Sequence, residues 1–383
     1  MTSTGRKLSG ALLLLCLSVF CAILASGCSG SDDATPTIPV EAVAIRTPRP
    51  TFTPPATATT TQVPATATPT ATATATLTPT PTRADNISPL TGLEADPELI
   101  HRRVLAFRVG NDPGIRPQDG LGAADIVYEE IMDGWTVTRF TALFLESEAT
   151  RVRPLRSARL ANLTMVPQYD AALVHTGASD PIRYLISQAT FVDLDQYFHP
   201  APYGLLAGYD WRGRMYSSTD AVRKYLEKQG LEREELIEGY AFDPEPPDGE
   251  PALAIRIPYP SSTVDWTYDD ATGLYLRKVS NQKHLDALTG DQITASNVIL
   301  FYTEHKRTNI VEDTNGATAI DIVMTGTGRA VVIRDGVQVE AEWRRTAEDE
   351  VIQYWDADGE IIPLKPGKTW IEMMPPDHEV TIG

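Results

Sequence analysis

Cysteine is almost absent from this sequence, and its few positions are informative. The 383 residues include three cysteines, Cys16, Cys21 and Cys28, and two of them lie inside an N-terminal apolar run. Processing of that run would leave no free thiol in the folded part. The sequence therefore excludes disulfides and cysteine-based zinc sites there, and the folded part is expected to draw its stability from its core.

Histidine pairs and nucleophile motifs are also lacking. The chain has no G-x-S-x-G elbow, and its six histidines are scattered with no close-spaced pair. A calcium site in the acidic loop 265–270 stays an open alternative, although the loop lacks the spacing of an EF-hand. The sequence predicts no metal site and no cofactor.

Positive charge is scarce. Lys and Arg number 33 against 51 Asp and Glu, a formal net charge of −18. The first 84 residues carry five basic and three acidic side chains, so about −20 falls on residues 85–383. Nucleic acid and anionic lipid are therefore poor partners for the bulk surface, and solubility outside the cell explains the charge.

The N-terminus has the pattern of a bacterial lipoprotein signal. Arg6 and Lys7 precede an apolar run over residues 11–25, which is short for a membrane span and suited to a secretory signal. The run ends in Leu24-Ala25-Ser26-Gly27-Cys28, which resembles a lipobox. We expect a signal peptide over residues 1–27, lipidation at Cys28, and a location on the outer face of the cytoplasmic membrane. An uncleaved N-terminal anchor helix is the alternative.

Residues 28–84 form a predicted tether. From Ala34 to Thr82 the chain is almost wholly Thr, Pro and Ala. Such a segment lacks the apolar side chains that would offset its ordering entropy, and its prolines favour extended polyproline II. At about 3.1 Å per residue it would reach well over 100 Å. The membrane contact is thus expected through the lipid anchor only.

The remaining chain is predicted to form two domains. Residues 85–241 mix strand and helix patterns and are expected to be α/β or α+β. Residues 251–383 consist mostly of short strand patterns, typical of a sandwich or barrel. In the first domain, Asp133-Gly134 predicts a type I′ hairpin that pairs Met132 with Trp135 and Glu130 with Val137. Asp335-Gly336 and Asp358-Gly359 predict turns of the same kind, and Ser157 predicts a helix cap.

Several motifs together resemble the YerB-like bacterial lipoproteins. The resemblance covers Pro89 to Pro375 and implies a two-domain extracytoplasmic lipoprotein, with no reaction implied. Family members often carry a Pro-His-Asn before a Leu-Tyr near the end of the first domain, and the matching stretch here reads Trp211-Arg212-Gly213-Arg214-Met215-Tyr216-Ser217, so that histidine is missing. The motifs that carry the resemblance are Pro89-Leu90-Thr91-Gly92, Arg116-Pro117-Gln118, Ala124 to Glu129, Thr138-Arg139-Phe140, Arg156 to Arg159, Val174-His175, His284 with Asp286, and Thr369-Trp370.

The stretch from Asn111 to Arg159 concentrates the polar candidates of the first domain. Glu129 falls in an apolar stripe, so its carboxylate must be paired or have a raised pKa. One interpretation is a buried network in which Glu129 and Asp125 pair with arginines. The other is an arginine clamp for a carboxylate or phosphate ligand. Its candidate residues are Asn111, Arg116, Gln118, Asp125, Glu129, Arg139, Arg156, Ser157 and Arg159.

Catalysis has only weak candidates, His175, Ser157 and Glu129. In the second domain His284, Asp286 and Gln292 are expected to fix a loop. The leading hypothesis is a lipid-anchored binding or assembly module that contacts a cell-wall glycan or an envelope protein, with no catalysis assigned. The alternative is an envelope hydrolase or transferase acting on a glycan or phosphodiester. A deep pocket lined by Glu129, Arg156 and His175 would favour the enzyme, and a shallow groove at the domain junction would favour binding.

Overall fold

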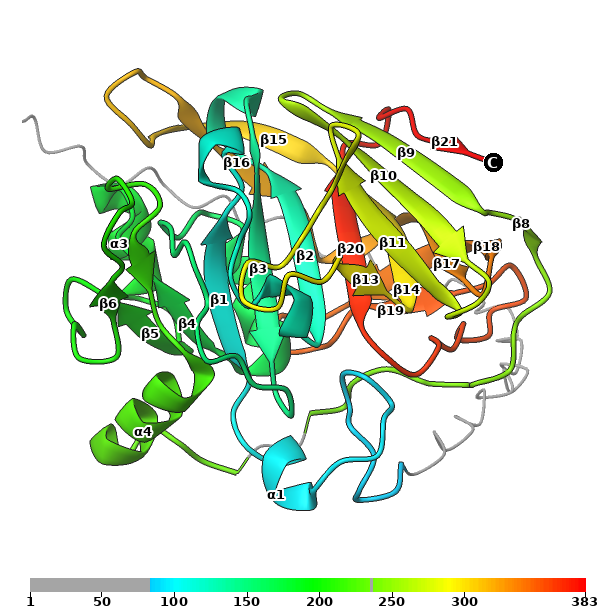
Figure 1. Cartoon of the computed structure of the whole chain (residues 1–383), viewed down its shortest axis with the longest axis horizontal. Helices are drawn as coiled ribbons and strands as arrows, with labels where there is room; N and C mark the ends of the chain where they lie inside the picture. The colour runs from blue at the N-terminus through cyan, green and yellow to red at the C-terminus, as the bar shows by residue number, and fades with distance from the viewer. Residues whose placement is uncertain (1–82, 235–236) are drawn as a thin grey trace, which may run out of the picture. The chain divides into compact units, whose positions relative to one another are not determined.

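An 11-stranded sheet runs through both halves of the chain that the computed structural model describes, residues 83–234 and 237–383 (Figure 1). Its main path is β19-β18-β17-β14-β20-β2-β3-β1-β4-β5, and β8 pairs with β18. The first half supplies β1 (Leu105–Gly110), β2 (Ile126–Ile131), β3 (Thr138–Phe144), β4 (Ala172–His175) and β5 (Val192–Asp195). The second half supplies β8 (Glu250–Pro251), β14 (Asn297–Tyr302), β17 (Gly326–Arg334), β18 (Val337–Arg345), β19 (Gln353–Trp355) and β20 (Thr369–Met374).

The two halves meet where β2 pairs in parallel with β20, from Ile126 opposite Thr369 to Glu129 opposite Glu372. Every residue of β1, β2, β3, β14 and β20 is buried. Strands covered on both faces have near-continuous apolar sequences, as in Val298 to Phe301. The expected fold class, a mixed α/β region followed by a mostly β region, is confirmed, and one sheet joins the two regions.

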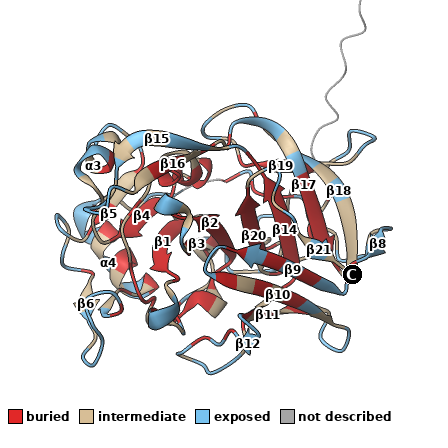
Figure 2. Ribbon diagram, turned by 90° about the horizontal axis from the view of Figure 1, so that it is seen from above, coloured by how far each residue is buried: buried red, intermediate tan, exposed pale blue. Residues whose placement is uncertain are grey.

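A second sheet covers the β14 and β20 side of the large sheet (Figures 1 and 2). Its strand β9 alternates between exposed and buried residues, so it presents one face to the core. Trp266 of β10 and Trp370 of β20 are in contact across the interface, with ring centroids 5.4 Å apart. The strands are β9 (Ala254–Tyr259), β10 (Ser262–Asp269), β11 (Leu274–Val279), β12 (Gln282–Lys283), β13 (Thr294–Ala295) and β21 (Thr381–Ile382).

Short helices and two small ribbons complete the described chain. Helix α4 begins after Ser218, whose side chain accepts a hydrogen bond from the backbone N–H of Ala221, and it ends at Gly230 in the left-handed conformation. No helix among the described residues is long and apolar enough to cross a membrane. The elements are α1 (Pro97–Ile100), α2 (Asn162–Met165), α3 (Asp180–Ile186), α4 (Thr219–Gln229), β6 (Gly204–Leu205), β7 (Met215–Tyr216), β15 (His305–Val311) and β16 (Thr318–Ile322).

The predicted register of the β2–β3 hairpin is wrong by two residues. The structure pairs Glu130 with Arg139 and Ile131 with Thr138. A short 3₁₀ turn, η3 (Asp133–Trp135), lengthens the connection, and both Gly134 and Trp135 have positive φ. A shift of two residues keeps each side chain on its expected face. Glu129 and Glu130 therefore still point to opposite faces of the sheet.

Three further local expectations have clear outcomes. Asp335-Gly336 is the expected two-residue turn, since Arg334 pairs with Val337. The prediction for Asp358-Gly359 is wrong, because the bridge partners Trp355 and Ile361 enclose five residues. Ser157 does not cap a helix: α2 begins at Asn162, and the Ser157 carbonyl instead accepts a hydrogen bond from Arg139.

Candidate functional site

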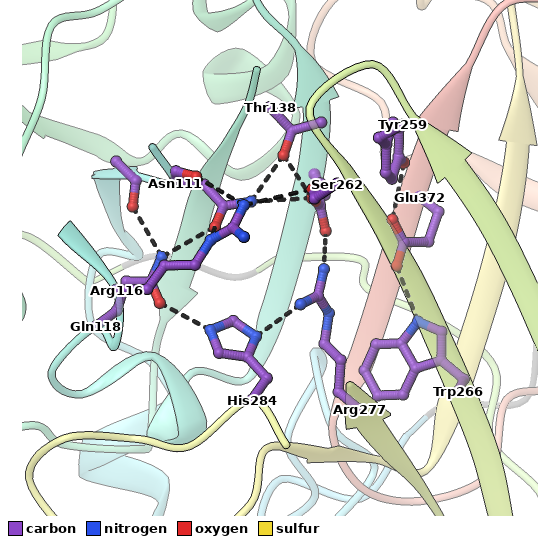
Figure 3. A network of polar contacts seen from close by, with 12 residues as sticks. Asn111, Arg116, Gln118, Thr138, Tyr259, Ser262, Trp266, Arg277, His284 and Glu372 are labelled. Atoms are coloured by element: carbon purple, nitrogen blue, oxygen red, sulfur yellow. Dashed lines mark hydrogen bonds and ion pairs between the residues drawn. The ribbon is translucent and has the colours of Figure 1, made fainter. Parts of the chain in front are cut away.

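A closed ring of buried polar side chains lies between the two sheets (Figure 3). It comprises Glu129 of β2, Arg277 of β11, and three residues from loops: His284, Gln118 and Asn111. None of the five is more than 3% exposed. Because burying charge without partners is costly, each of these groups must be paired inside the protein. The first half of the chain contributes Asn111, Gln118 and Glu129, and the second half contributes the other two.

The hydrogen bonds of the ring fix the protonation of His284. Arg277 can only donate, so Nδ1 of His284, 2.6 Å from Nη1 of Arg277, accepts. Nε2 of His284 then carries the proton and donates to Oε1 of Gln118 at 2.7 Å. Burial, with Arg277 and Arg116 nearby, holds the pKa of His284 well below its usual value of 6.5. His284 is therefore neutral and engaged at both nitrogens.

The amide groups close the ring back to Glu129. Gln118 donates through Nε2 to Oδ1 of Asn111 at 3.1 Å. Asn111 donates to Oε1 of Glu129 at 3.2 Å, and Oγ1 of Thr138 donates to the same oxygen at 2.5 Å. Arg277 forms an ion pair with Oε2 of Glu129. Both oxygens of this buried carboxylate are thus satisfied.

A second buried carboxylate, Glu372 of β20, lies opposite Glu129 in the parallel pair. It accepts hydrogen bonds from Oη of Tyr259 at 2.8 Å and Nε1 of Trp266 at 2.9 Å. Burial, followed by repulsion from Glu129, raises the pKa of Glu372 from 4.5 to about 8. Glu372 is therefore protonated at neutral pH, and Arg277 has one charged carboxylate to balance.

Arg277 is enclosed by aromatic rings. Its guanidinium carbon lies 4.6 Å from the ring centroid of Trp370 and 5.6 Å from those of Phe140 and Trp266. A weakly hydrated, planar guanidinium suits such an environment better than an ammonium group would. This arrangement fixes the position of the cation between the two sheets.

A cavity of about 370 Å³ opens beside the ring, between the loop after β1 and the β11–β12 turn. Arg116 in its wall donates to Oδ1 and to the backbone oxygen of Asn111, at 2.8 and 2.9 Å. Among the described residues Arg116 has no carboxylate within ion-pair distance. The wall also includes Pro113, Pro117, Ser261, Val279, Ser280, Gln282, Lys283, His284 and Leu285.

Asp286 links the two halves of the chain, and Gln292 holds its own loop against β11. Asp286 accepts hydrogen bonds from the backbone N–H groups of Gly120 and Gly122, at 3.0 and 2.8 Å. Gln292 donates to the backbone oxygen of Arg277 at 2.8 Å.

Asp125 lies at the other end of β2. Its Oδ2 accepts a hydrogen bond from the N–H of Leu145 at 2.6 Å, and burial beside Glu146 raises the pKa of Asp125 to about 7.

Three of the sequence-predicted arginines lie on the opposite face of the large sheet. Arg159 pairs with Asp133, whereas Arg139 donates to the Ser157 carbonyl at 2.9 Å and has no ion pair among the described residues. Arg156 lies under Trp211, with its guanidinium carbon 5.1 Å from the ring centroid. The structure thus separates the expected clamp: Arg116, Asn111, Gln118 and Glu129 lie on one face, and Arg139, Arg156 and Arg159 on the other.

His175 lies apart from both groups. Its Nδ1 is 2.9 Å from the Gly177 carbonyl and its Nε2 is 2.7 Å from Oδ1 of Asp193. Both partners are acceptors, so the imidazole acts as a hydrogen-bonded link between β4 and its neighbours. Glu129, Arg156 and His175 do not line the cavity. Within residues 83–234 and 237–383, no group of three or more His, Cys, Asp or Glu is arranged to hold a metal ion.

Sequence reasoning missed Arg277 and Glu372, although both leave a signal. Arg277 occupies an inward position of β11, between the buried Tyr275 and Val279. Glu372 is the one charged residue of the fully buried strand TWIEMM. A charge at an inward position requires a buried partner, but the sequence does not show which one.

Comparisons with known proteins assign the chain to a family. Residues 90–232 match the family described as "Protein of unknown function (DUF3048) N-terminal domain", and residues 255–371 match its C-terminal domain. The chain is 28% identical over 308 residues to the Bacillus subtilis (strain 168) protein named "Putative lipoprotein YerB", covering 75% of this chain and 86% of that protein.

The crystal structure of YerB protein from Bacillus subtilis has the same fold. It matches with a TM-score of 0.68 at 26% identity, covering 77% of this chain and 99% of that one. The family segments lie on either side of residues 242–250, where the sequence predicts a boundary. The expected resemblance is confirmed: the chain belongs to the DUF3048 family and is homologous to the Bacillus subtilis protein named "Putative lipoprotein YerB".

Proposed function

We propose that this protein is a lipid-anchored binding or assembly protein on the outer face of the bacterial cytoplasmic membrane, and that its cavity beside Arg116 holds an anionic ligand of the cell envelope. The predicted lipobox at Cys28 and the name of its relative, a putative lipoprotein, support the location. Cys28 and residues 28–82 lie outside the described residues, so this part rests on sequence alone.

The observation that carries the proposal is a cationic side chain without an acidic partner in the wall of a cavity. Arg116 has no ion pair among the described residues, and Lys283 lines the same cavity. A volume of about 370 Å³ falls within the range of small-molecule sites. In a chain of net charge −18, two cations in one cavity favour an anion.

The apolar residues in the cavity wall indicate which anions would fit. Pro113, Pro117, Val279 and Leu285 provide nonpolar surface next to the two cations. A ligand with one carboxylate or phosphate and an uncharged, partly apolar body fits both surfaces. Soluble cell-wall fragments that carry a carboxylate are ligands of this kind, and they are the first to test.

A binding titration tests this proposal. A muramidase digest of cell wall is titrated against the detergent-solubilised full chain, and heat or fluorescence reports binding. Lys283→Gln removes an exposed cation and leaves the buried ring intact, so its affinity should fall by about tenfold. Lys228→Gln, an exposed lysine of α4, is the matched control and should bind like the unmodified chain. Equal affinity in all three proteins, or no binding, would contradict the proposal.

The alternative is an envelope hydrolase or transferase that uses the buried pair Glu129 and Glu372. Glu372 is protonated at neutral pH, as a general acid must be. However, Glu129 and Glu372 do not line the cavity, and Arg277, His284 and Gln118 fill the space around them. Release of new reducing ends or phosphate from the same digest would favour this alternative over binding alone.

A further inference from the structure

The arginines on the opposite face of the sheet form a second cationic group that the cavity does not use. Arg139 is 4% exposed, and its Nε makes no hydrogen bond among the described residues. The same is true of Nε of Arg156. Neither has a carboxylate within ion-pair distance in the described part of the chain, in contrast to Arg108, which pairs with Glu130, and Arg159, which pairs with Asp133. Two guanidiniums therefore lack a counter-charge in direct contact.

Electrostatic repulsion between neighbouring arginines further destabilises the charged form of Arg139. Burial lowers the pKa of Arg139 well below its ordinary value, and the neighbouring arginines 159, 108 and 156 lower it further. The charge of Asp112 raises the pKa of both Arg139 and Arg156, but Asp112 forms an ion pair with neither. An added anion would offset the repulsion between the arginines and give both guanidiniums a charged acceptor in place of the lost water.

An exposed aromatic ring lies over the same group. Trp211, in the loop between β6 and β7, is 69% exposed, and its ring lies over the Arg156 guanidinium at 5.1 Å. A large exposed tryptophan is unusual on a soluble surface and is enriched at binding sites. This loop is also where the sequence departs from the family pattern, with Trp211 and Arg212 near the position of the missing histidine.

The backbone of β1 leaves space for the Arg156 side chain below Trp211. Arg156 follows Pro154 and Leu155, and its N–H donates to the Arg108 carbonyl at 2.9 Å. Its side chain crosses Gly110 of β1, where an added Cβ would lie 2.6 Å from Cγ of Arg156. Glycine at this position therefore gives the Arg156 stem room against the strand, below Trp211.

We propose that Arg156, backed by Arg139 and covered by Trp211, forms a binding site for a phosphate monoester carried on a sugar ring. A phosphate monoester has close to two negative charges at neutral pH and three acceptor oxygens, which match two unpaired guanidiniums better than one carboxylate does. Trp211 provides a flat face for the attached ring. This site lies on the opposite face of the sheet from the cavity at Arg116. The two binding proposals can therefore be tested independently of each other.

Calorimetric titration of the detergent-solubilised full chain with glucose 6-phosphate, inorganic phosphate and glucose tests the site. The expected order of affinity is sugar phosphate, then phosphate, with no measurable binding of glucose. Arg156→Gln should weaken both phosphates by about tenfold or more. Trp211→Ala should weaken the sugar phosphate and leave inorganic phosphate nearly unchanged, because only the sugar contacts the ring.

The matched control is Arg344→Gln. Arg344 also lies over a tryptophan, Trp355 at 4.8 Å, but it is paired with Glu342. Its substitution should leave phosphate binding intact. Thermal unfolding of each variant shows whether it is folded, and Arg156→Lys provides a second variant that keeps the charge and loses the fork-shaped contact. Absence of phosphate binding to the unmodified chain, or equal binding by Arg156→Gln, would overturn the proposal.

Discussion

Arg277 is the cation that both halves of the chain share. It comes from β11 in the second half, pairs with Glu129 in the first, and donates to His284. Its side chain is fully buried, as is that of Glu129. Breaking a buried pair leaves an uncompensated charge, which costs far more than the net contribution of the intact pair.

Removal of one partner is therefore predicted to be severe. Arg277→Met should lower the free energy of unfolding by about 3–5 kcal/mol, because Glu129 is left charged and buried. The double variant Glu129→Leu, Arg277→Met should recover a large part of this loss. Urea unfolding monitored by tryptophan fluorescence measures both. Arg256→Met, which removes a partly exposed pair with Asp265, is the control and should cost at most about 1 kcal/mol.

The raised pKa of Glu372 predicts a pH dependence of stability. Between its ordinary value of 4.5 and about 8, the folded state holds a proton that the unfolded state has released. The free energy of unfolding should thus fall as pH rises through this window, by about 1.4 kcal/mol per pH unit for each proton. Asp125, with its pKa raised to about 7, acts in the same direction.

Glu372→Gln isolates this contribution, because glutamine stays neutral. The variant should lose stability less steeply than the unmodified chain between about pH 5 and 8. The slope that remains should come partly from Asp125. Parallel slopes in the two proteins, measured by urea unfolding at several pH values, would show that Glu372 does not hold a proton.

The sequence reveals which single residues are unusual but not their partners. Glu129 was expected to be buried with a charged partner, and it is, but the partner is Arg277 rather than one of the nearby arginines. The two residues are separated by 148 positions. Their contact depends on the packing of one sheet over another, which local patterns do not determine.

At the scale of elements, Asp286 anchors the turn between β12 and β13 to the loop before β2. Asp286→Ala would leave the N–H groups of Gly120, Gly122 and Leu288 without their acceptor, at a predicted cost of about 2–4 kcal/mol. Hydrogen exchange at the two glycines should become faster. Asp291→Ala removes an exposed carboxylate of the same turn and should leave exchange unchanged.

Strands were easier to predict than their connections. The alternating and continuous apolar runs identified the central strands, because burial on one or two faces leaves a direct pattern. The β2–β3 connection differed because Trp135 adopts a positive φ and extends the turn, which Asp133-Gly134 alone does not indicate. The helix expected after Ser157 is displaced to Asn162, since the Ser157 carbonyl accepts from the buried Arg139.

At the scale of the molecule, the shared sheet makes each half depend on the other. A fragment of residues 83–241 would expose β2 as an edge strand, with the Glu129 face uncovered. We predict that this fragment lacks cooperative unfolding and aggregates, whereas residues 83–383 unfold in one transition. Near-UV circular dichroism and size-exclusion chromatography compare them. A monomeric fragment with a sharp transition would support two independently folding domains.

The composition of the chain predicted its division into regions, but it did not predict which residues of these regions contact one another. The change from strand and helix patterns to mostly strands predicted the two regions, and the family segments fall on either side of the acidic stretch 242–250. The parallel pairing of β2 with β20 joins residues more than two hundred positions apart. A contact of such long range leaves no signal in a single sequence.

Site-specific photocrosslinking at the cavity tests the central claim, ligand binding beside Arg116, most directly. All three natural cysteines lie in the first 28 residues, so a cysteine introduced at Gln282 would be the one free thiol of the lipidated chain. A photoreactive group there, in the native membrane, should capture an anionic envelope component identifiable by mass spectrometry, and less of it in a Lys283→Gln background. A cysteine at the exposed Glu360 should capture little of it. Equal capture at both positions, or none at Gln282, would contradict the account.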